Sequence, residues 1–124
     1  MSSGGTVRGG RRVDKPWGHE LIWAEASKYV GKILHIEAGQ QTSFQYHVKK
    51  EETIHLLRGV LTFEYQDESG QRLQRRVDPG ETIHIPPGFR HRMKAVETCD
   101  VLEVSTPELD DVVRVEDTYG RAKD

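Results

Sequence analysis

Residues 80–91 read Gly-Glu-Thr-Ile-His-Ile-Pro-Pro-Gly-Phe-Arg-His and carry the clearest structural signal in the chain. Residues 81–85 predict a short strand. Two prolines then end the strand, because proline offers no N–H group to a sheet, and Gly88 allows a tight turn. The turn redirects the chain, so His91 follows the strand at a fixed position. The stretch therefore predicts a strand, a turn and a histidine whose place is set by both.

Short runs of the same kind fill the rest of the chain body. In residues 31–37, for example, Lys32, Leu34 and Ile36 share one face, as alternate residues of a strand do. Turn residues separate the runs, and no segment of the body shows a convincing helical period. We predict strands at residues 31–37, 43–47, 52–57, 60–66, 71–77, 81–85, 92–96 and 101–105. This series is typical of an all-β sandwich or barrel, and a jelly roll is a natural closure for it.

Length and composition narrow the possible functions. The chain has 124 residues and a mass of 14.2 kDa, which indicates one domain. Only 35% of its residues are hydrophobic, and no run approaches the ~18 apolar residues of a membrane-spanning helix. The formal net charge of -2 leaves no basic surplus for nucleic-acid binding, and the single cysteine, Cys99, excludes internal disulfides. We therefore expect neither a membrane nor a nucleic acid as a partner.

The two ends of the chain differ from its body. Residues 1–12 are rich in glycine and predict a flexible tail, which lacks the apolar run of a secretory signal. Residues 13–124 are predicted to form one barrel, with a charged C-terminal extension over residues 107–124. Trp17 and Tyr119 are expected to pack the two ends against that barrel. We expect the protein to be cytoplasmic.

Four polar side chains from three separate predicted elements suit a divalent cation. Gln45 and His47 are two residues apart, so they project from the same face of one strand. Glu52 begins the next strand, which would return beside them in an antiparallel pair, and His91 follows the double-proline turn. Two nitrogen and two oxygen donors would hold a metal ion and leave positions for water or substrate.

These residues stand in two motifs that resemble those of the cupin superfamily. Residues 39–59 carry Gly-(5)-Gln-Tyr-His-(4)-Glu-(6)-Gly, similar to the first cupin motif with glutamine in place of its first histidine. Residues 80–91 carry Gly-(5)-Pro-Pro-Gly-(2)-His, similar to the second motif, whose terminal asparagine is replaced by Ala95. The resemblance implies a single-domain cupin, a double-stranded β-helix or jelly-roll barrel. It also implies the metal ligands Gln45, His47, Glu52 and His91.

A further resemblance, over residues 15–121, is to the type II mannose-6-phosphate isomerase family. It rests on Lys-Pro-Trp-Gly-His-Glu at 15–20, Ser-Phe-Gln-Tyr-His at 43–47 and, above all, Asp-Asp-Val-Val-Arg-Val-Glu-Asp-Thr-Tyr-Gly-Arg at 110–121. It implies a metal-dependent aldose–ketose isomerase acting on a sugar phosphate such as mannose 6-phosphate. It also implies one divalent ion, with zinc favoured and manganese, iron, cobalt or nickel as alternatives.

Two features set the chain apart from that family. The family usually has a histidine-rich run where this chain has Val-Lys-Lys-Glu at residues 48–51. The family's cupin domain also often follows a sugar-nucleotide transferase domain, which these 124 residues do not include. Because the metal ligands match, the altered run bears on the substrate rather than on metal binding.

Candidate catalytic and substrate-binding residues lie on the predicted strands and on the C-terminal extension. Lys32 shares a face with core residues, so we expect it at the cavity end, paired or in contact with substrate. Glu103 matches a glutamate of the isomerase-like family and is either a catalytic carboxylate or the structural partner of Lys32. His84 could line the pocket and act in catalysis. Arg114 and Arg90 could bind a substrate phosphate, with surface ion pairing as the alternative.

Two other functions fit the same ligand set. A cupin dioxygenase that uses iron or nickel would use open metal positions for O₂, and a non-catalytic module would bind a sugar or a metal without turnover. The metal-dependent isomerase is our first hypothesis, with a sugar or sugar phosphate as the expected partner. A homodimer is also predicted, because the edge strand at residues 71–77 offers a surface, although its arginines argue against a dry interface.

Overall fold

The structure is a computed structural model that describes residues 4–121, and all regular secondary structure in that range is β-strand. The strands are β1 (Arg11–Lys15), β2 (Gly18–Glu25), β3 (Val30–Ile36), β4 (Phe44–Tyr46), β5 (Glu52–Arg58), β6 (Leu61–Gln66), β7 (Arg72–Val77), β8 (Thr82–Ile85), β9 (His91–Ala95), β10 (Cys99–Ser105) and β11 (Val113–Glu116). They form a six-stranded sheet in the order β1-β2-β3-β10-β5-β8 and a five-stranded sheet in the order β11-β4-β9-β6-β7. Within the described range, no helix is long and apolar enough to cross a membrane.

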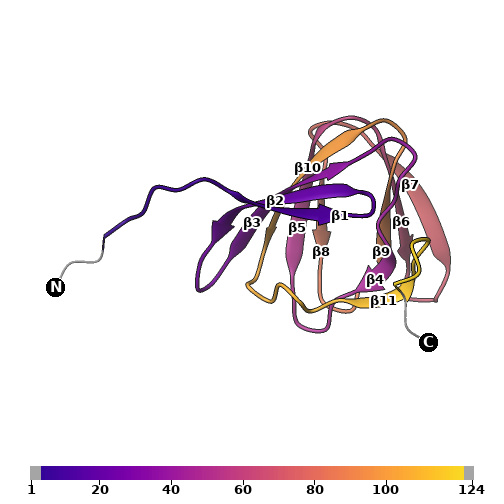
Figure 1. Cartoon of the computed structure of the whole chain (residues 1–124). Helices are drawn as coiled ribbons and strands as arrows, with labels where there is room; N and C mark the ends of the chain where they lie inside the picture. The colour runs from indigo at the N-terminus through magenta and orange to yellow at the C-terminus, as the bar shows by residue number, and fades with distance from the viewer. Residues whose placement is uncertain (1–3, 122–124) are drawn as a thin grey trace.

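The two sheets face each other as a jelly-roll barrel (Figure 1). From β3 onward the chain crosses to the other sheet after every strand except β6, which is followed by its neighbour β7. The last segment, yellow in Figure 1, runs from β10 along one end of the barrel to β11, which pairs with β4. The predicted all-β jelly roll is confirmed, and each predicted strand is present within two residues of its expected bounds.

Three neighbouring strands of the larger sheet bury every second residue, and each of these inward rows has one charged member. The rows are Lys32-Leu34-Ile36 in β3, Cys99-Val101-Glu103 in β10 and Glu52-Ile54-Leu56 in β5. The register pairs Lys32 with Glu103, and Ile36 with Cys99. The charged members therefore gather at one end of the barrel, while the apolar members continue into the hydrophobic core.

Three strands go beyond the sequence prediction. β1 and β2 form a hairpin at the edge of the larger sheet, and β11 lies in the C-terminal extension. The side chains of β1 and β11 are exposed or half-buried, so these strands lack the apolar alternation that marks a buried strand. β1 begins at Arg11, inside the predicted tail of residues 1–12, of which residues 1–3 lie outside the described range.

Two aromatic residues attach the flanking segments to the barrel. Trp17, in the turn between β1 and β2, is buried and belongs to the core. Tyr119 packs against the same core, and its hydroxyl donates a hydrogen bond to Gln40 Oε1 at 2.6 Å. β7 forms one edge of the smaller sheet. The predicted packing of both aromatic residues and the predicted edge strand are confirmed.

Gly59 allows the close approach of two chain segments after β5. Its φ is +92°, and a Cβ atom there would lie 2.3 Å from the carbonyl oxygen of Thr98. Gly80 has the same φ of +92°, yet a Cβ atom there would meet nothing within 4 Å. We expect Gly59→Ala to lower the free energy of unfolding by about 3 kcal/mol or more, and Gly80→Ala by about 1–2 kcal/mol, the cost of a left-handed backbone alone. Urea denaturation measures both values, and equal losses would contradict the expectation.

Candidate metal centre and its cavity

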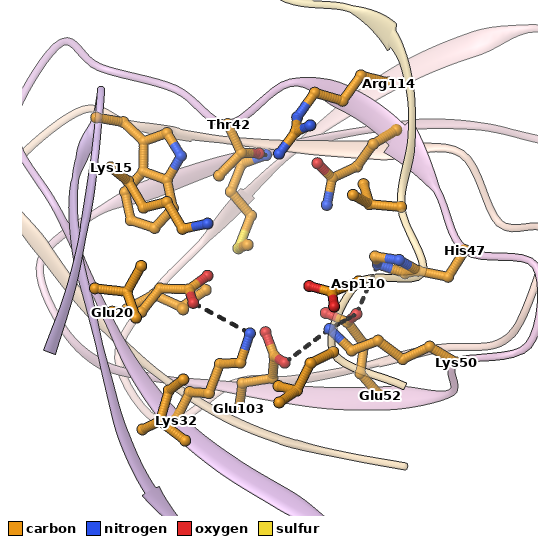
Figure 2. Close-up of a pocket in the computed structure, with 18 of the residues that line it drawn as sticks. Lys15, Glu20, Lys32, Thr42, His47, Lys50, Glu52, Glu103, Asp110 and Arg114 are labelled. Carbon is orange, nitrogen blue, oxygen red and sulfur yellow. Dashed lines mark hydrogen bonds and ion pairs between the residues drawn. The ribbon is translucent and has the colours of Figure 1, made fainter. Parts of the chain in front are cut away.

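A cavity opens at the charged end of the barrel, between the strands and the C-terminal segment (Figure 2). Its volume is about 230 Å³. Pockets for drug-sized ligands measure roughly 300–1,000 Å³, so this one suits a molecule of about monosaccharide size. Charged side chains line it from several elements, and they include Lys15, Glu20, Lys32, Lys50, Glu52, Glu103, Asp110 and Arg114.

Two histidines each turn one ring nitrogen toward a backbone carbonyl. His47 Nδ1 lies 2.5 Å from the carbonyl oxygen of Asp111, and His91 Nδ1 lies 2.8 Å from that of Phe89. A carbonyl oxygen only accepts hydrogen bonds, so each Nδ1 must carry a proton. A ring that carries only this proton presents a lone pair at Nε2, and both Nε2 atoms are buried without a hydrogen-bond partner among the described residues. Metal-binding histidines are usually held in this way.

Glu52 brings a carboxylate to the same place. The ligand atoms of His47, Glu52 and His91 all lie within 4.8 Å of one another, and the three residues are buried. Glu52 Oε2 is 2.9 Å from His47 Nε2. At this distance the two atoms repel each other unless a proton or a metal ion lies between them. Burial alone would raise the pKa of Glu52, but its contact with His47 and the positive charge of Lys50 outweigh burial and lower the pKa to about 2. The carboxylate is therefore ionised at neutral pH.

This donor set fits a divalent metal ion. Imidazole nitrogens and a carboxylate oxygen are typical ligands of zinc and its neighbours, and burial lowers the pKa of His91, which keeps that ring neutral. Gln45, the fourth predicted ligand, lines the cavity, and its backbone pairs with that of His91 between β4 and β9. Gln45 Oε1 accepts a hydrogen bond from Ser43 Oγ at 2.6 Å, and ligation by Gln45 stays a prediction.

Asp111, in the C-terminal segment, fixes the loop that joins two of the candidate ligands. Its carboxylate accepts hydrogen bonds from the backbone N–H groups of Lys49, Val48 and Lys50 at 2.6, 3.0 and 2.8 Å. These bonds, that from Lys49 foremost, hold the pKa of Asp111 below its usual range. The carbonyl group of the same residue orients His47, which lies 64 positions earlier in the chain. One residue thus positions both the loop and the first histidine.

Lys50 enters the cavity from that loop and is a site residue absent from our sequence prediction. Only 5% of it is exposed, and its Nζ lies 3.3 Å from Glu52 Oε2 and 3.0 Å from Glu103 Oε2. Burial would lower the pKa of Lys50, but the two carboxylates raise it above its usual value. Lys50 lies in the loop before β5 rather than in the strand, so strand alternation does not predict its inward direction.

Lys32 and Glu103 both line the cavity, but each has another ion-pair partner. Lys32 Nζ lies 3.2 Å from Glu20 Oε1, whereas Glu103 pairs with Lys50, as the dashed lines in Figure 2 show. Burial and the negative charge of Glu52 raise the pKa of Glu103. The structural partner of Lys32 is therefore Glu20 rather than Glu103. Glu103 is a buried carboxylate in the cavity with a raised pKa.

Two residues of the predicted site lie outside the cavity. The His84 side chain in β8 is 56% exposed, and its Nε2 lies 2.5 Å from Glu51 Oε2. The next residue, Ile85, is fully buried, so strand alternation turns His84 outward. Arg90 lies over the Tyr46 ring, with its guanidinium carbon 4.9 Å from the ring centroid, and lines a separate pocket. The structure thus corrects the expectation that these two side chains join the site.

Two cationic side chains face the cavity without an ion-pair partner among residues 4–121. Arg114 in β11 has a buried Nε with no hydrogen-bond partner in the described part of the chain. Lys15 ends β1 and lines the cavity from another wall. Figure 2 shows both side chains at the cavity, well apart from each other. Their positive charge could be neutralised by an anionic group of a ligand.

Comparisons with known proteins agree with this geometry. A family model described as the cupin domain matches residues 32–105. Xanthan biosynthesis protein XanB of Xanthomonas campestris pv. campestris is 28% identical over 116 residues, which are 90% of this chain and 24% of that protein. Mannose-1-phosphate guanylyltransferase ManC of Salmonella typhimurium is also 28% identical over 116 residues, which are 90% of this chain and 23% of that protein. The chain thus spans about a quarter of the length of these curated relatives.

Solved structures share the architecture at low sequence identity. Oxalate decarboxylase from Bacillus subtilis superposes with a TM-score of 0.75 and 16% identity, over 90% of this chain and 33% of that chain. KdgF from Halomonas sp. gives a TM-score of 0.68 and 18% identity, over 81% of this chain and 88% of that chain. At such identities the likeness shows the fold alone.

The variant His91→Ala tests the metal centre. It removes a buried imidazole beside the other candidate ligands, so we expect the purified protein to lose stoichiometric metal. The loss should exceed the roughly 10- to 100-fold weakening that follows removal of an outer-shell partner. His84→Ala is the control, because His84 lies outside the cavity and should leave the metal content unchanged. Elemental analysis by plasma mass spectrometry measures metal per chain, and unchanged metal in the His91 variant would mean that the centre lies elsewhere.

The variant Asp111→Ala tests how the centre is positioned. It removes three hydrogen bonds from the loop between His47 and Glu52, so we expect Zn²⁺ binding to weaken by about 10- to 100-fold. Asp67→Ala is a matched control, because Asp67 accepts backbone N–H groups in the turn between β6 and β7. Calorimetric titration should show the loss in the Asp111 variant alone, and similar losses in both would point to general destabilisation.

Proposed function

The chain belongs to the cupin family, and we propose that it is a metal-dependent isomerase that interconverts an aldose phosphate and a ketose phosphate, such as mannose 6-phosphate. The observation that carries the proposal is the convergence of two imidazole lone pairs and a carboxylate beside a small charged cavity. A proton donor–acceptor pair, Lys50 and Glu103, lies in the same cavity. Metal-assisted isomerisation uses a Lewis acid and a proton-transferring group that both reach the same sugar.

His47, Glu52 and His91 would hold the ion, and Gln45 would complete the set. Zinc is the first choice, while manganese, iron, cobalt and nickel also accept nitrogen and oxygen ligands. When bound, the ion would supply Lewis-acid stabilisation of negative charge on the sugar oxygens. Mn(II) centres are described for the oxalate decarboxylase of Bacillus subtilis, which shares this fold at 17% identity, so manganese stays among the alternatives.

Glu103 is the preferred general base for moving a proton between the two sugar carbons. Burial and the nearby charge of Glu52 raise its pKa, and a base is most effective when its pKa approaches the working pH. Glu52 is a poorer base, because its pKa is lowered to about 2. Lys50 and Lys32 would act as hydrogen-bond donors that hold Glu103 and the sugar hydroxyls in place.

Arg114 would bind the phosphate end of the substrate. Its Nε is buried and has no hydrogen-bond partner among the described residues, so a phosphate oxygen could take that position. Lys15 would add charge from another wall of the cavity. Anchoring one end of the sugar in this way would orient its reacting carbons toward Glu103.

The relatives support a sugar ligand but not a whole activity. XanB and ManC are named for xanthan biosynthesis and for guanylyl transfer to mannose 1-phosphate, and this chain spans about a quarter of either protein. A cavity of about 230 Å³ favours a monosaccharide over a nucleotide sugar. The homodimer and the cytoplasmic location stay predictions.

The activity test uses metal-loaded protein and mannose 6-phosphate, with the ketose product followed by NMR. We expect turnover that stops on chelation. Glu103→Gln should lower kcat by about 10²–10⁴-fold, the usual contribution of a general base, while the metal content is retained. Arg114→Met should raise KM by about tenfold or more, because it removes a charge-assisted contact. Arg90→Met, outside the cavity, is the matched control and should change neither value.

Three results would favour a different function. Absence of turnover for every sugar phosphate tried with metal-loaded protein would contradict the isomerase. Oxygen consumption by iron-loaded protein would support a cupin dioxygenase instead. Protection against melting by a sugar phosphate, with neither activity, would support a non-catalytic binding module.

A further inference from the structure

The ammonium group of Lys50 contacts a candidate metal ligand directly. Lys50 Nζ lies 3.3 Å from Glu52 Oε2, and the lysine is 5% exposed. The backbone N–H group of Lys50 donates a hydrogen bond to Asp111 Oδ2 at 2.8 Å, which fixes the backbone from which the side chain enters the barrel. The preceding residue, Lys49, is exposed, so the loop sends one lysine to solvent and the other inward.

One carboxylate oxygen is shared between Lys50 and a histidine. Glu52 Oε2 lies 3.3 Å from Lys50 Nζ and 2.9 Å from His47 Nε2. His47 is oriented by the contact of its Nδ1 with the carbonyl oxygen of Asp111, so its Nε2 points toward the same carboxylate. Lys50 is thus a buried cation in contact with Glu52, and a divalent ion on His47 Nε2 would need the same carboxylate.

Lys50 cannot easily move away from such an ion. Its Nζ is also held by Glu103 Oε2 at 3.0 Å, and its side chain has almost no exposed surface. Like charges repel more strongly where water is excluded, so a buried ammonium group opposes a second cation beside it. The repulsion is thus built into the walls of the cavity rather than screened by solvent.

We propose that Lys50 is a resident competitor of the metal ion, which balances Glu52, stays on Glu103 when a divalent ion binds, and weakens metal binding. Because of this repulsion, a divalent ion binds only if its own affinity for the two imidazoles is high. Manganese binds nitrogen ligands more weakly than zinc does, so we expect manganese to be excluded before zinc. This inference concerns metal binding alone and does not depend on the identity of the substrate.

The test is titration of Mn²⁺ and Zn²⁺ into metal-stripped protein with two matched variants. Lys50→Met removes the buried charge and keeps an apolar chain of similar length, while Lys49→Met removes the same charge from the exposed neighbour. We expect Mn²⁺ to bind at least about tenfold more tightly to the Lys50 variant, because a close repulsive charge is gone. The Lys49 variant should stay within about twofold of the parent, because exposed charges are screened.

A second pair of variants guards against loss of folding. Lys50→Met leaves Glu103 buried without its ion-pair partner, which could destabilise the fold. The double variant Lys50→Met/Glu103→Gln avoids this, and it is compared with the single variant Glu103→Gln. Thermal melting checks that both proteins are folded. Tighter Mn²⁺ binding in the double variant would support the proposal, as would metal binding that appears only when Lys50 is replaced. Unchanged or weaker binding in the folded Lys50 variants, or no metal binding by any variant, would overturn it.

Discussion

The cost of burying charge at one end of a β-barrel governs the arrangement of this site. Lys32, Glu52 and Glu103 stand in inward rows that are otherwise apolar, and each is at most 5% exposed. Each charge must find a partner inside the barrel, because an unpaired buried charge is costly. Glu20 from β2 and Lys50 from the loop before β5 supply those partners. The barrel therefore closes around a charged network, and the same network is what a metal ion and a polar ligand would meet.

The C-terminal segment belongs to the site as much as to the fold. Asp111 holds the loop that carries Lys50 and also orients the His47 ring, so docking this segment arranges a candidate ligand and a buried cation together. The same segment leads into β11, which brings Arg114 to the cavity. Docking of this segment and assembly of the site are therefore coupled.

Local geometry explains which features the sequence could predict. Strand alternation and the glycine and proline turns are local properties, so the strands of the barrel follow from them. The expected antiparallel pair of the Glu52 strand with the strand of Gln45 is wrong, because β5 and β4 lie in different sheets, and the three candidate ligands meet between the sheets. Lys50 is harder to predict, because the direction of a loop residue depends on hydrogen bonds to Asp111, 61 positions away. Ion-pair partners are equally non-local: the sequence offers Glu103 for Lys32, and packing of β2 against β3 supplies Glu20. The exposed hairpin of β1 and β2 lacks a burial pattern on its outer strand, so it too depends on tertiary context.

The net charge of the cavity couples the binding of a metal ion to the binding of an anionic ligand. The buried network consists of three carboxylates and two ammonium groups, Glu20, Glu52, Glu103, Lys32 and Lys50. With Glu103 ionised, one divalent cation would change the net charge of this network from negative to positive. Arg114 and Lys15 add positive charge at the walls. An anionic ligand would then be held much better in the presence of the metal than in its absence, and by linkage the ligand would strengthen metal binding to the same degree.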